Sequence, residues 1–279
     1  MSAPPTILVF DSGLGGLTVL REIVRARPDA HYIYVADDAF FPYGHHGEEQ
    51  IIARVVPLVG ELIAIHRPDL VVIACNTAST LVMSHLRAAY KVPFVGTVPA
   101  IKPACASSKT KRVSVLGTKG TVKREYTRRL IHDFAQGCEV TLVGSAELAS
   151  LAESALSGNE VNDKDISAEL APCFVGNGET DSARTDTVVL ACTHYPLLKD
   201  KIQRFLPAGV QLLSQGQIVA NSLVDYLNRH PEIEEKCSKN GQLAFFTTDS
   251  TEDFDNHATT FFGKPVSSSH LDLEKAAQC

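Results

Sequence analysis

The chain has 279 residues, with 26 lysines and arginines against 32 aspartates and glutamates, a net charge of −6 and an isoelectric point near 5.9. This acidic balance argues against binding to nucleic acid or to an anionic membrane surface. Hydrophobic residues make up 44% of the chain and charged residues 21%, which indicates a globular protein rather than a disordered or fibrous one. At this length we expect one large domain or two of ordinary size.

The sequence carries no membrane or export signal that we can identify. No apolar run approaches the roughly 18 residues that span a bilayer. The first apolar stretch, 7–10, has no basic segment before it and ends at Asp11. We therefore expect a cytoplasmic protein with no membrane partner.

Seven cysteines form no C-x-x-C pair and no cluster with histidines. A structural zinc site is therefore not expected, and we predict no metal ligands. An odd, scattered set of this kind is typical of free thiols in a reducing compartment, most of them packed as small hydrophobic residues. The seven are Cys75, Cys105, Cys138, Cys173, Cys192, Cys237 and Cys279.

In chain order, short apolar runs alternate with helical spacing, which predicts an α/β fold with mainly parallel sheets. In the first part, we predict strands at 7–10, 32–36 and 70–74 and helices at 17–26, 48–66 and 80–90. A glycine-rich turn at 11–16 and a loop at 37–44 follow two of these strands. Ligands of open α/β sheets bind beside such strand ends.

A second series begins after Pro99. We predict strands at 112–116, 139–143 and 187–191, helices at 121–134, 147–157, 164–175 and 199–205, and a loop at 176–184. The last part adds strands at 210–213 and 242–246 and helices at 218–227 and 254–262, and the polar tail from Pro265 is expected to fray.

One internal repeat places a cysteine directly after an apolar strand in each series. Residues 71–77 read V-V-I-A-C-N-T and residues 188–194 read V-V-L-A-C-T-H. Agreement on the Ala-Cys pair and the polar turn is much less common by chance than similarity of two apolar strands. We infer two related α/β halves, each with a thiol at the carboxyl edge of its sheet.

A thiol at a strand-to-helix turn meets the positive end of the following helix, which favours its thiolate form. Two such thiols facing each other across a cleft could invert a stereocentre: one takes a proton from a carbon, and the other returns a proton to the opposite face. A redox pair is an alternative, but Cys75 and Cys192 lack the local spacing of redox motifs. Two packed core thiols are a second alternative, and we predict that fate for the other five cysteines.

The neighbours of the two cysteines suit a small zwitterion. Asn76, Thr77, Thr193 and the backbone N–H groups of both turns are donors for a carboxylate. Asp11 and Ser12 could receive an ammonium group, although a helix N-cap is a serious alternative for them. The aromatic and acidic loop at 37–44 could equally be ordinary surface. A lone histidine such as His194 is more often structural, but beside Cys192 it could stabilise a thiolate.

Six motifs extend over nearly the whole chain: F-D-S-G-L-G-G at 10–16, A-D-D-A-F-F-P-Y-G at 36–44, A-C-N-T-A-S-T at 74–80, G-T-V-P-A-I-K-P-A at 96–104, V-L-G-T-K-G-T at 115–121 and L-A-C-T-H-Y-P-L-L at 190–198. With them, the chain resembles the glutamate racemases of the aspartate/glutamate racemase family. That resemblance implies an isomerase that interconverts L- and D-glutamate without a cofactor and supplies D-glutamate for peptidoglycan.

The resemblance also implies roles for individual residues. Cys75 matches the cysteine that acts on the D-isomer, and Cys192 matches the one that acts on the L-isomer. Positions that match polar residues assisting proton transfer are Asp11, Asp37, Glu153 and His194. Positions that match substrate-binding residues are Asp11, Ser12, Tyr43, Gly44, Asn76, Thr77, Thr118, Thr121, Thr193 and His194.

The implied fold is two pseudo-symmetric α/β domains with mainly parallel sheets and the active site in the cleft between them. We expect residues 1–98 with 212–279 to form the first domain and residues 99–211 the second. The expected partners are the small-molecule substrate and a second copy of the chain in a homodimer, without nucleic acid. Two alternatives stay open: a racemase of another amino acid such as aspartate, and a two-domain amino-acid binding protein with inert thiols.

Overall fold

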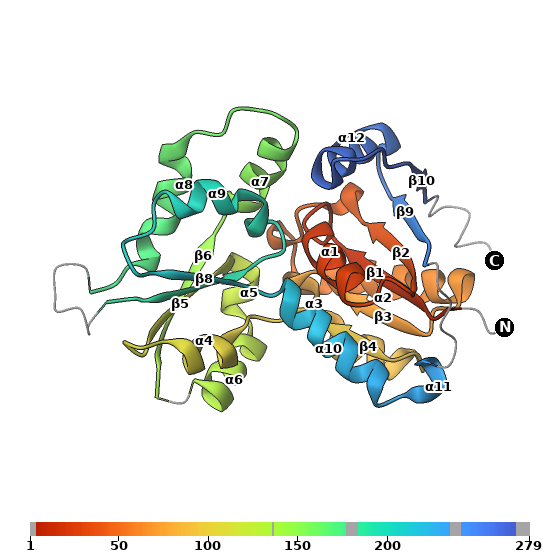
Figure 1. The fold of residues 1–279 in the computed structure, drawn as a ribbon, viewed down its shortest axis with the longest axis horizontal. Helices are drawn as coiled ribbons and strands as arrows, with labels where there is room; N and C mark the ends of the chain where they lie inside the picture. Colours follow the sequence, from red (N-terminus) through yellow and green to blue (C-terminus); the bar gives the residue numbers. More distant parts are fainter. Residues whose placement is uncertain (1–3, 136, 177–183, 235–240, 272–279) are drawn as a thin grey trace. The chain divides into compact units, whose positions relative to one another are not determined.

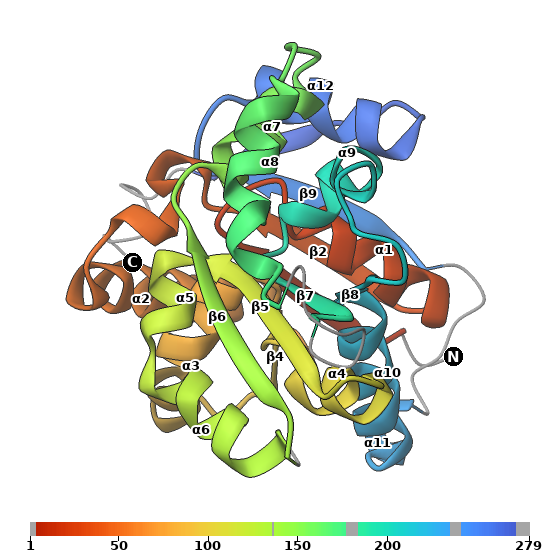
Figure 2. The same ribbon diagram turned by 90° about the vertical axis from the view of Figure 1, so that its left-hand side faces the viewer.

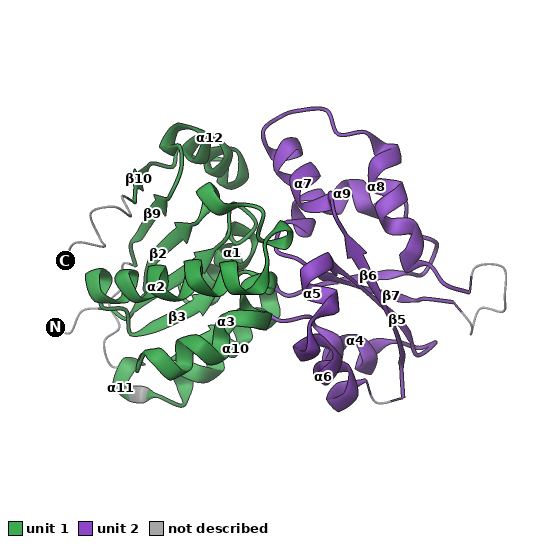
Figure 3. Cartoon of the chain, turned by 180° about the vertical axis from the view of Figure 1, so that it is seen from behind, with its two compact units in different colours: residues 1–97, 216–279 green, residues 98–215 purple. Residues whose placement is uncertain are grey.

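A computed structural model describes residues 4–135, 137–176, 184–234 and 241–271. The chain divides into two compact units (Figure 3): unit 1 contains residues 1–97 and 216–279, and unit 2 contains residues 98–215. Each unit is built around one parallel sheet (Figure 1), so the predicted α/β architecture is confirmed. None of the helices in the described part of the chain is long and apolar enough to cross a bilayer.

The sheet of unit 1 has the strand order β10-β9-β2-β1-β3-β4, and its pairings are all parallel. Its strands are β1 (Thr6–Asp11), β2 (His31–Ala36), β3 (Leu70–Ile73), β4 (Phe94–Gly96), β9 (Leu243–Thr247) and β10 (Ser268–His270). Strand β3, which lies between β1 and β4, is buried at every position. Such a continuous apolar run is typical of a parallel strand that is covered on both faces of its sheet.

Helices cover both faces of this sheet. They are α1 (Leu17–Ala26), α2 (Glu48–His66), α3 (Asn76–Ala89), α10 (Gly216–Asn228), α11 (Pro231–Glu234) and α12 (Thr251–Phe262). Leu8, Phe10 and Val35 share a buried cluster with residues of α2 and α3. Tyr34, next to Val35, packs instead on Phe254 of α12, with ring centroids 6.2 Å apart. Successive side chains of a strand point to opposite faces, so both faces are packed.

The sheet of unit 2 has the order β6-β5-β7-β8 and is also parallel; its strands can be followed in Figure 2. Its strands are β5 (Arg112–Thr118), β6 (Glu139–Ser145), β7 (Thr187–Ala191) and β8 (Gln211–Ser214). Its helices are α4 (Ile101–Ser107), α5 (Lys119–Lys123), α6 (Glu125–Phe134), α7 (Leu148–Leu156), α8 (Asp163–Leu170) and α9 (Lys199–Gln203), with short 3₁₀ turns η3 (Ala171–Cys173) and η5 (Tyr195–Leu198).

Three predicted helices have different bounds. The helix expected from residue 80 begins at Asn76, because asparagine and threonine, which are weak helix formers in a helix interior, are well tolerated in a first turn. The helix expected over 121–134 is divided into α5 and α6, because Arg124 has an extended backbone with ψ of 140°. The helix expected over 164–175 ends at Leu170 and continues as the turn η3.

Strands β4 and β10 and helices α4 and α11 were not predicted. Strands β4 and β10 have three residues each, which is too short for a periodic pattern, and Pro103 disguises the short helix α4. Strand β10 pairs with β9, so the expectation that the chain frays from Pro265 is wrong for residues 268–270. Residues 272–279 and most of the loop at 176–184 lie outside the described residues.

Candidate active site

In unit 1, the predicted site residues follow strands at the carboxyl edge of the sheet. Asp11 ends β1, Asp37 follows β2 directly, and Cys75 lies two residues beyond β3. The parallel register pairs Asp11 with Ala36 and Phe10 with Ile73, so the three strands end side by side. This is the edge at which open α/β sheets bind ligands.

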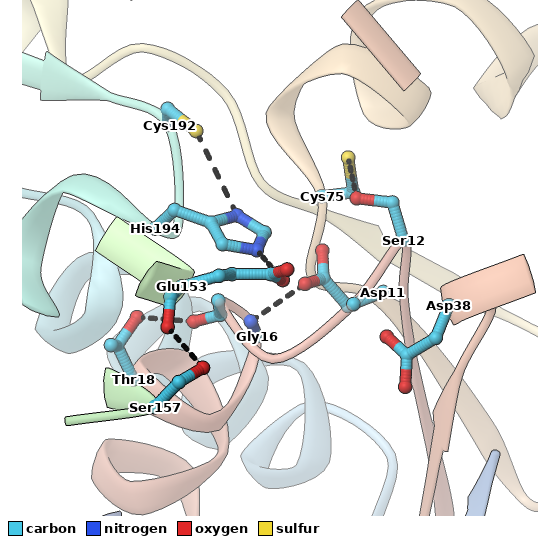
Figure 4. Close-up of polar contacts among 12 residues, drawn as sticks. Asp11, Ser12, Gly16, Thr18, Asp38, Cys75, Glu153, Ser157, Cys192 and His194 are labelled. Atoms are coloured by element: carbon cyan, nitrogen blue, oxygen red, sulfur yellow. Dashed lines mark hydrogen bonds and ion pairs between the residues drawn. The ribbon is translucent and has the colours of Figure 1, made fainter. Parts of the chain in front are cut away.

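Cys75 is the N-cap residue of α3, a helix of 14 residues. Its Sγ accepts the backbone N–H of Ala78 at 3.5 Å and lies 3.5 Å from Oγ of Ser12 (Figure 4). The side chain is 5% exposed. The predicted helix N-terminus at this thiol is confirmed, and its partial positive charge favours a thiolate.

The glycine-rich turn after β1 is held by Asp11. Its Oδ2 accepts the backbone N–H of Gly16 at 2.7 Å, and the residue is fully buried (Figure 4). A Cβ at Gly16 would lie 2.5 Å from Cβ of Asp11, so only glycine fits there. Asp11 therefore stabilises the turn into α1. The N-cap residue of α1 is Gly16, without a side-chain cap hydrogen bond, so the N-cap alternative for Asp11 and Ser12 is wrong. The same turn brings Ser12 to Cys75.

Asn76 and Thr77 form the first turn of α3, directly after Cys75. Both residues are buried, with 2% and 3% exposure. The polar sequence cluster behind β3 therefore packs at the N-terminus of the helix. The backbone N–H groups at the N-terminus of a helix point outward and can bind an anion such as a carboxylate.

Asp37 lies in a network of side chains that reach it from three other segments. Tyr43, in the turn η2 (Tyr43–His45) that also contains Gly44, donates its hydroxyl to Asp37 Oδ2 at 2.7 Å. Arg54 of α2 donates to both carboxylate oxygens, at 2.6 and 3.0 Å. Thr248 donates its Oγ1 to Oδ1 at 2.9 Å.

Sequence patterns did not single out Arg54 or Thr248. Arg54 lies inside the regular helix α2, and Thr248 follows β9, 211 residues beyond Asp37. Only the parallel pairing of β2 with β9 brings Thr248 to this edge. A motif search reads neighbours in the chain, so no local signal identifies such partners.

In unit 2, Cys192 follows β7 without a gap and is 6% exposed. We expected the positive end of the following helix to meet this thiol, but that helix begins only at Lys199, so this expectation is wrong. The strand leads into the four-residue turn η5 and then the five-residue helix α9. A chain that turns this tightly aligns few peptide dipoles on Cys192.

His194 lies beside Cys192 in place of a helix N-terminus. Its Nδ1 is 4.0 Å from Sγ of Cys192, and its Nε2 is 2.8 Å from Oε1 of Glu153 on α7 (Figure 4). Burial alone would lower the pKa of His194, but hydrogen bonds to Cys192 and Glu153 and their charges raise it well above its usual value. A protonated imidazole between a carboxylate and a thiol stabilises the thiolate.

Two predicted threonines lie at the carboxyl end of β5, the neighbour of β7. Thr118 caps α5 by accepting the backbone N–H of Thr121 at 3.1 Å, and the two hydroxyls are 3.0 Å apart. Thr193, which follows Cys192 in the sequence, is also buried. The register places Gly117 opposite Ala191, so these residues share one sheet edge.

The remaining cysteines separate from these two. Cys105 and Cys173 are fully buried, as predicted, and burial raises the pKa of each to about 12. Cys138 is partly exposed, and Cys237 and Cys279 lie outside the described residues. In the part of the chain that the structure describes, no three His, Cys, Asp or Glu side chains gather in an arrangement that could hold a metal ion.

Each unit is thus a parallel α/β unit with a buried cysteine at the carboxyl end of a strand, Cys75 in unit 1 and Cys192 in unit 2. Residues 7–223 match the family described as Asp/Glu/hydantoin racemase, and the chain belongs to that family. It is therefore an isomerase.

Three bacterial glutamate racemases are similar to this chain. Glutamate racemase of Brucella canis is 51% identical over 243 residues, which cover 87% of this chain and 86% of the relative. The structure of Escherichia coli glutamate racemase, solved with L-glutamate and the activator UDP-MurNAc-Ala, is similar with a TM-score of 0.82 at 37% identity, over 96% of this chain and 97% of that one. Glutamate racemase RacE1 of Bacillus anthracis has a TM-score of 0.81 at 29% identity, over 96% and 98% of the two chains.

Proposed function

We propose that this racemase interconverts L- and D-glutamate, with Cys75 and Cys192 as its two bases and without a cofactor. The observation that carries the proposal is the pair of thiols at equivalent strand ends, each with a partner that favours its thiolate. The names of the relatives at 51% and 37% identity support glutamate as the substrate.

The reaction needs one thiolate and one thiol at a time. From D-glutamate, the thiolate of Cys75 takes the Cα proton, and the thiol of Cys192 gives its proton to the opposite face of the carbon. The product is L-glutamate, with Cys75 now a thiol and Cys192 a thiolate. The reverse direction exchanges the two roles, so no external proton donor or oxidant is required.

Removal of a Cα proton from an amino acid is difficult because the product carbanion is poorly stabilised. Preorganised donors to the substrate carboxylate and exclusion of water lower this barrier. We assign the carboxylate to Asn76, Thr77 and Thr193 with the backbone N–H groups of their turns. The remaining substrate contacts are assigned to Asp11, Ser12, Tyr43, Gly44, Thr118, Thr121 and His194.

Two thiols that act on opposite faces of one carbon must belong to parts of the chain that both reach it. We propose that the two units act as domains, with residues 1–98 and 212–279 in one and residues 99–211 in the other. As in the family, D-glutamate would enter peptidoglycan synthesis, which places the enzyme in the cytoplasm, and we expect a homodimer.

The test is the change in optical rotation of L-glutamate with the purified protein and no added cofactor, beside L-aspartate as the competing substrate. Cys75→Ala and Cys192→Ala should each lower the rate by about 10²- to 10⁴-fold or more, while calorimetry still detects glutamate binding. Cys138→Ala is the matched control, since Cys138 follows no strand of either sheet. Full turnover by either single variant, or faster turnover of aspartate, would reject the proposal.

A further inference from the structure

The carboxylate of Asp37 is saturated with donors. Its Oδ1 accepts from Arg54 Nη2 and from Thr248, and its Oδ2 accepts from Arg54 Nε and from Tyr43. The side chain is fully buried. A carboxylate offers about four lone-pair sites, and all of them are used here. Asp37 therefore has no free position from which to accept a proton from a substrate.

Arg54 supplies the charge that balances this buried carboxylate. Its guanidinium makes the bidentate contact with Asp37 and is itself 28% exposed. It also lies over the ring of Phe40, 5.8 Å from the centroid, and that ring stacks on His46 at 3.8 Å. Arg54 thus contacts Asp37 and Phe40, which precede Tyr43 and Gly44, and Phe40 in turn contacts His46, which follows them.

Tyr43 connects this network to Cys75. The two side chains belong to the same buried cluster. Burial, followed by the charge and hydrogen bond of Asp37, raises the pKa of Tyr43 well above its usual value, and the charges of Cys75 and Asp11 contribute in the same direction. The Tyr43 hydroxyl is therefore a fixed donor to Asp37 within electrostatic reach of the thiol.

We propose that Arg54 and Thr248 are positioning residues of the Cys75 site, acting through Asp37. Arg54 balances the charge of the Asp37 carboxylate, and Arg54 and Thr248 together fix its position. Asp37 in turn fixes the turn at Tyr43 and Gly44 and does not transfer protons itself. The inference deepens the proposed function and rests on it for its effect on turnover.

The loss of Arg54 would change the net charge of the side chains that are linked to Cys75. Tyr43 of η2 interacts electrostatically with Asp37, Cys75 and Asp11, and Arg54 of α2 forms the ion pair with Asp37. Without Arg54, the Asp37 carboxylate would add an uncompensated negative charge near the thiol. A like charge disfavours a thiolate, so Cys75 would react more slowly with an electrophile.

The test measures alkylation of Cys75 by iodoacetamide at pH 7 in the folded protein without substrate, followed by peptide mass spectrometry. Arg54→Gln should slow the alkylation of Cys75 by about tenfold. Asp37→Asn added to Arg54→Gln removes both charges and should restore the rate to within about threefold of the wild type. Thr248→Ser keeps the hydroxyl and should leave the alkylation rate of Cys75 at the wild-type value. Thr248→Val removes the hydroxyl and should change that rate.

Cys192 of the same molecules is the internal control, because it lies in the other unit and outside this network. Arg25→Gln is the matched charge control, since Arg25 is 67% exposed on α1 and donates to Glu22. If Arg54→Gln fails to fold, Arg54→Lys keeps the charge and should retain the rate at Cys75 better than any neutral variant that folds.

An unchanged rate at Cys75 in Arg54→Gln, or an equal change at Cys75 and Cys192, would overturn the proposal. Slower alkylation of Cys75 in the double variant Arg54→Gln with Asp37→Asn than in Arg54→Gln alone would also overturn it. Because alkylation requires no substrate, these outcomes are independent of whether glutamate is turned over. In the turnover assay, the single variant should lose kcat/KM about tenfold for both isomers, since racemisation has an equilibrium constant of unity.

Discussion

The turns that carry Cys75 and Cys192 look alike in sequence but support their thiols in different ways. Cys75 caps a helix of 14 residues and receives a backbone N–H from Ala78. Cys192 precedes only a short 3₁₀ turn and has the imidazole of His194 beside it. The first support is a permanent dipole, and the second is a group that gains and loses a proton.

This difference predicts different responses to pH. A helix N-terminus contributes about 0.3 to 1 kcal/mol toward an anion, and up to about 2 kcal/mol when partly buried, at any pH at which the helix is folded. A protonated histidine contributes only below its own pKa. The Cys75 site should therefore depend little on a neighbouring titration, whereas the Cys192 site should follow His194.

The largest expected effect comes from His194. His194→Asn removes the cation beside Cys192 and should lower kcat/KM by about 10²-fold. Alkylation of Cys192 at neutral pH should slow strongly, while alkylation of Cys75 stays within about twofold of the wild type. The measurement is site-resolved mass spectrometry, with His132→Asn as a control, because His132 is 88% exposed. Equal slowing at both thiols would remove the distinction between the two sites.

A smaller effect is expected from Glu153→Gln, which keeps a hydrogen-bond acceptor but removes the charge beside His194. The variant should lose about tenfold in kcat/KM at pH 8, because burial then lowers the pKa of His194. The alkaline fall in activity should therefore move to lower pH. A pH–rate profile checks this, and a profile with the wild-type alkaline limb would contradict it.

The same substitution should change the dependence of stability on pH. The pKa of His194 is raised on folding, so protonation of His194 stabilises the folded state. This stabilisation is complete below the pKa of the unfolded state, about 6.5, and is lost as the pH rises through the pKa of the folded state. Urea unfolding of the wild type should show this loss above about pH 6.5, and Glu153→Gln should show a smaller one over the same range.

The smallest effect is expected at Ser12. Ser12→Ala removes one weak contact with Cys75 at 3.5 Å and leaves the helix N-terminus intact. A hydrogen bond of about 0.5 to 1 kcal/mol corresponds to a two- to fivefold loss of kcat/KM. The position of the alkaline limb should not move, since no titrating group is changed. A shift of that limb would mean that Ser12 acts on more than Cys75.

Local patterns predicted the two buried strands that lead to Cys75 and Cys192 better than the groups that surround these thiols. The runs before Cys75 and Cys192 identify buried parallel strands because such strands are apolar without interruption. The supporting groups come from elsewhere in the chain: Glu153 is 41 residues from His194, and Thr248 is 211 residues from Asp37. Only the folded sheets bring these partners together.

The error at Cys192 has a specific cause. The sequence after each strand is polar and leads into helical spacing, so we expected the positive end of a helix at both thiols. In T-H-Y-P, the proline at 196 fits the first turn of either an α-helix or a 3₁₀ turn, and periodicity over four residues does not distinguish them. Short elements such as β4 and β10 fall below the same limit.

The central claim is that each thiol serves one isomer, and hydrogen exchange at Cα in deuterated water tests it most directly. With Cys75→Ala, the remaining Cys192 should exchange the Cα hydrogen of L-glutamate for deuterium with retention of configuration and leave D-glutamate unlabelled. Cys192→Ala should label D-glutamate alone, and the wild type should label both isomers as it inverts them. Labelling of the same isomer by both variants, or inversion by either at the wild-type rate, would contradict the two-thiol account.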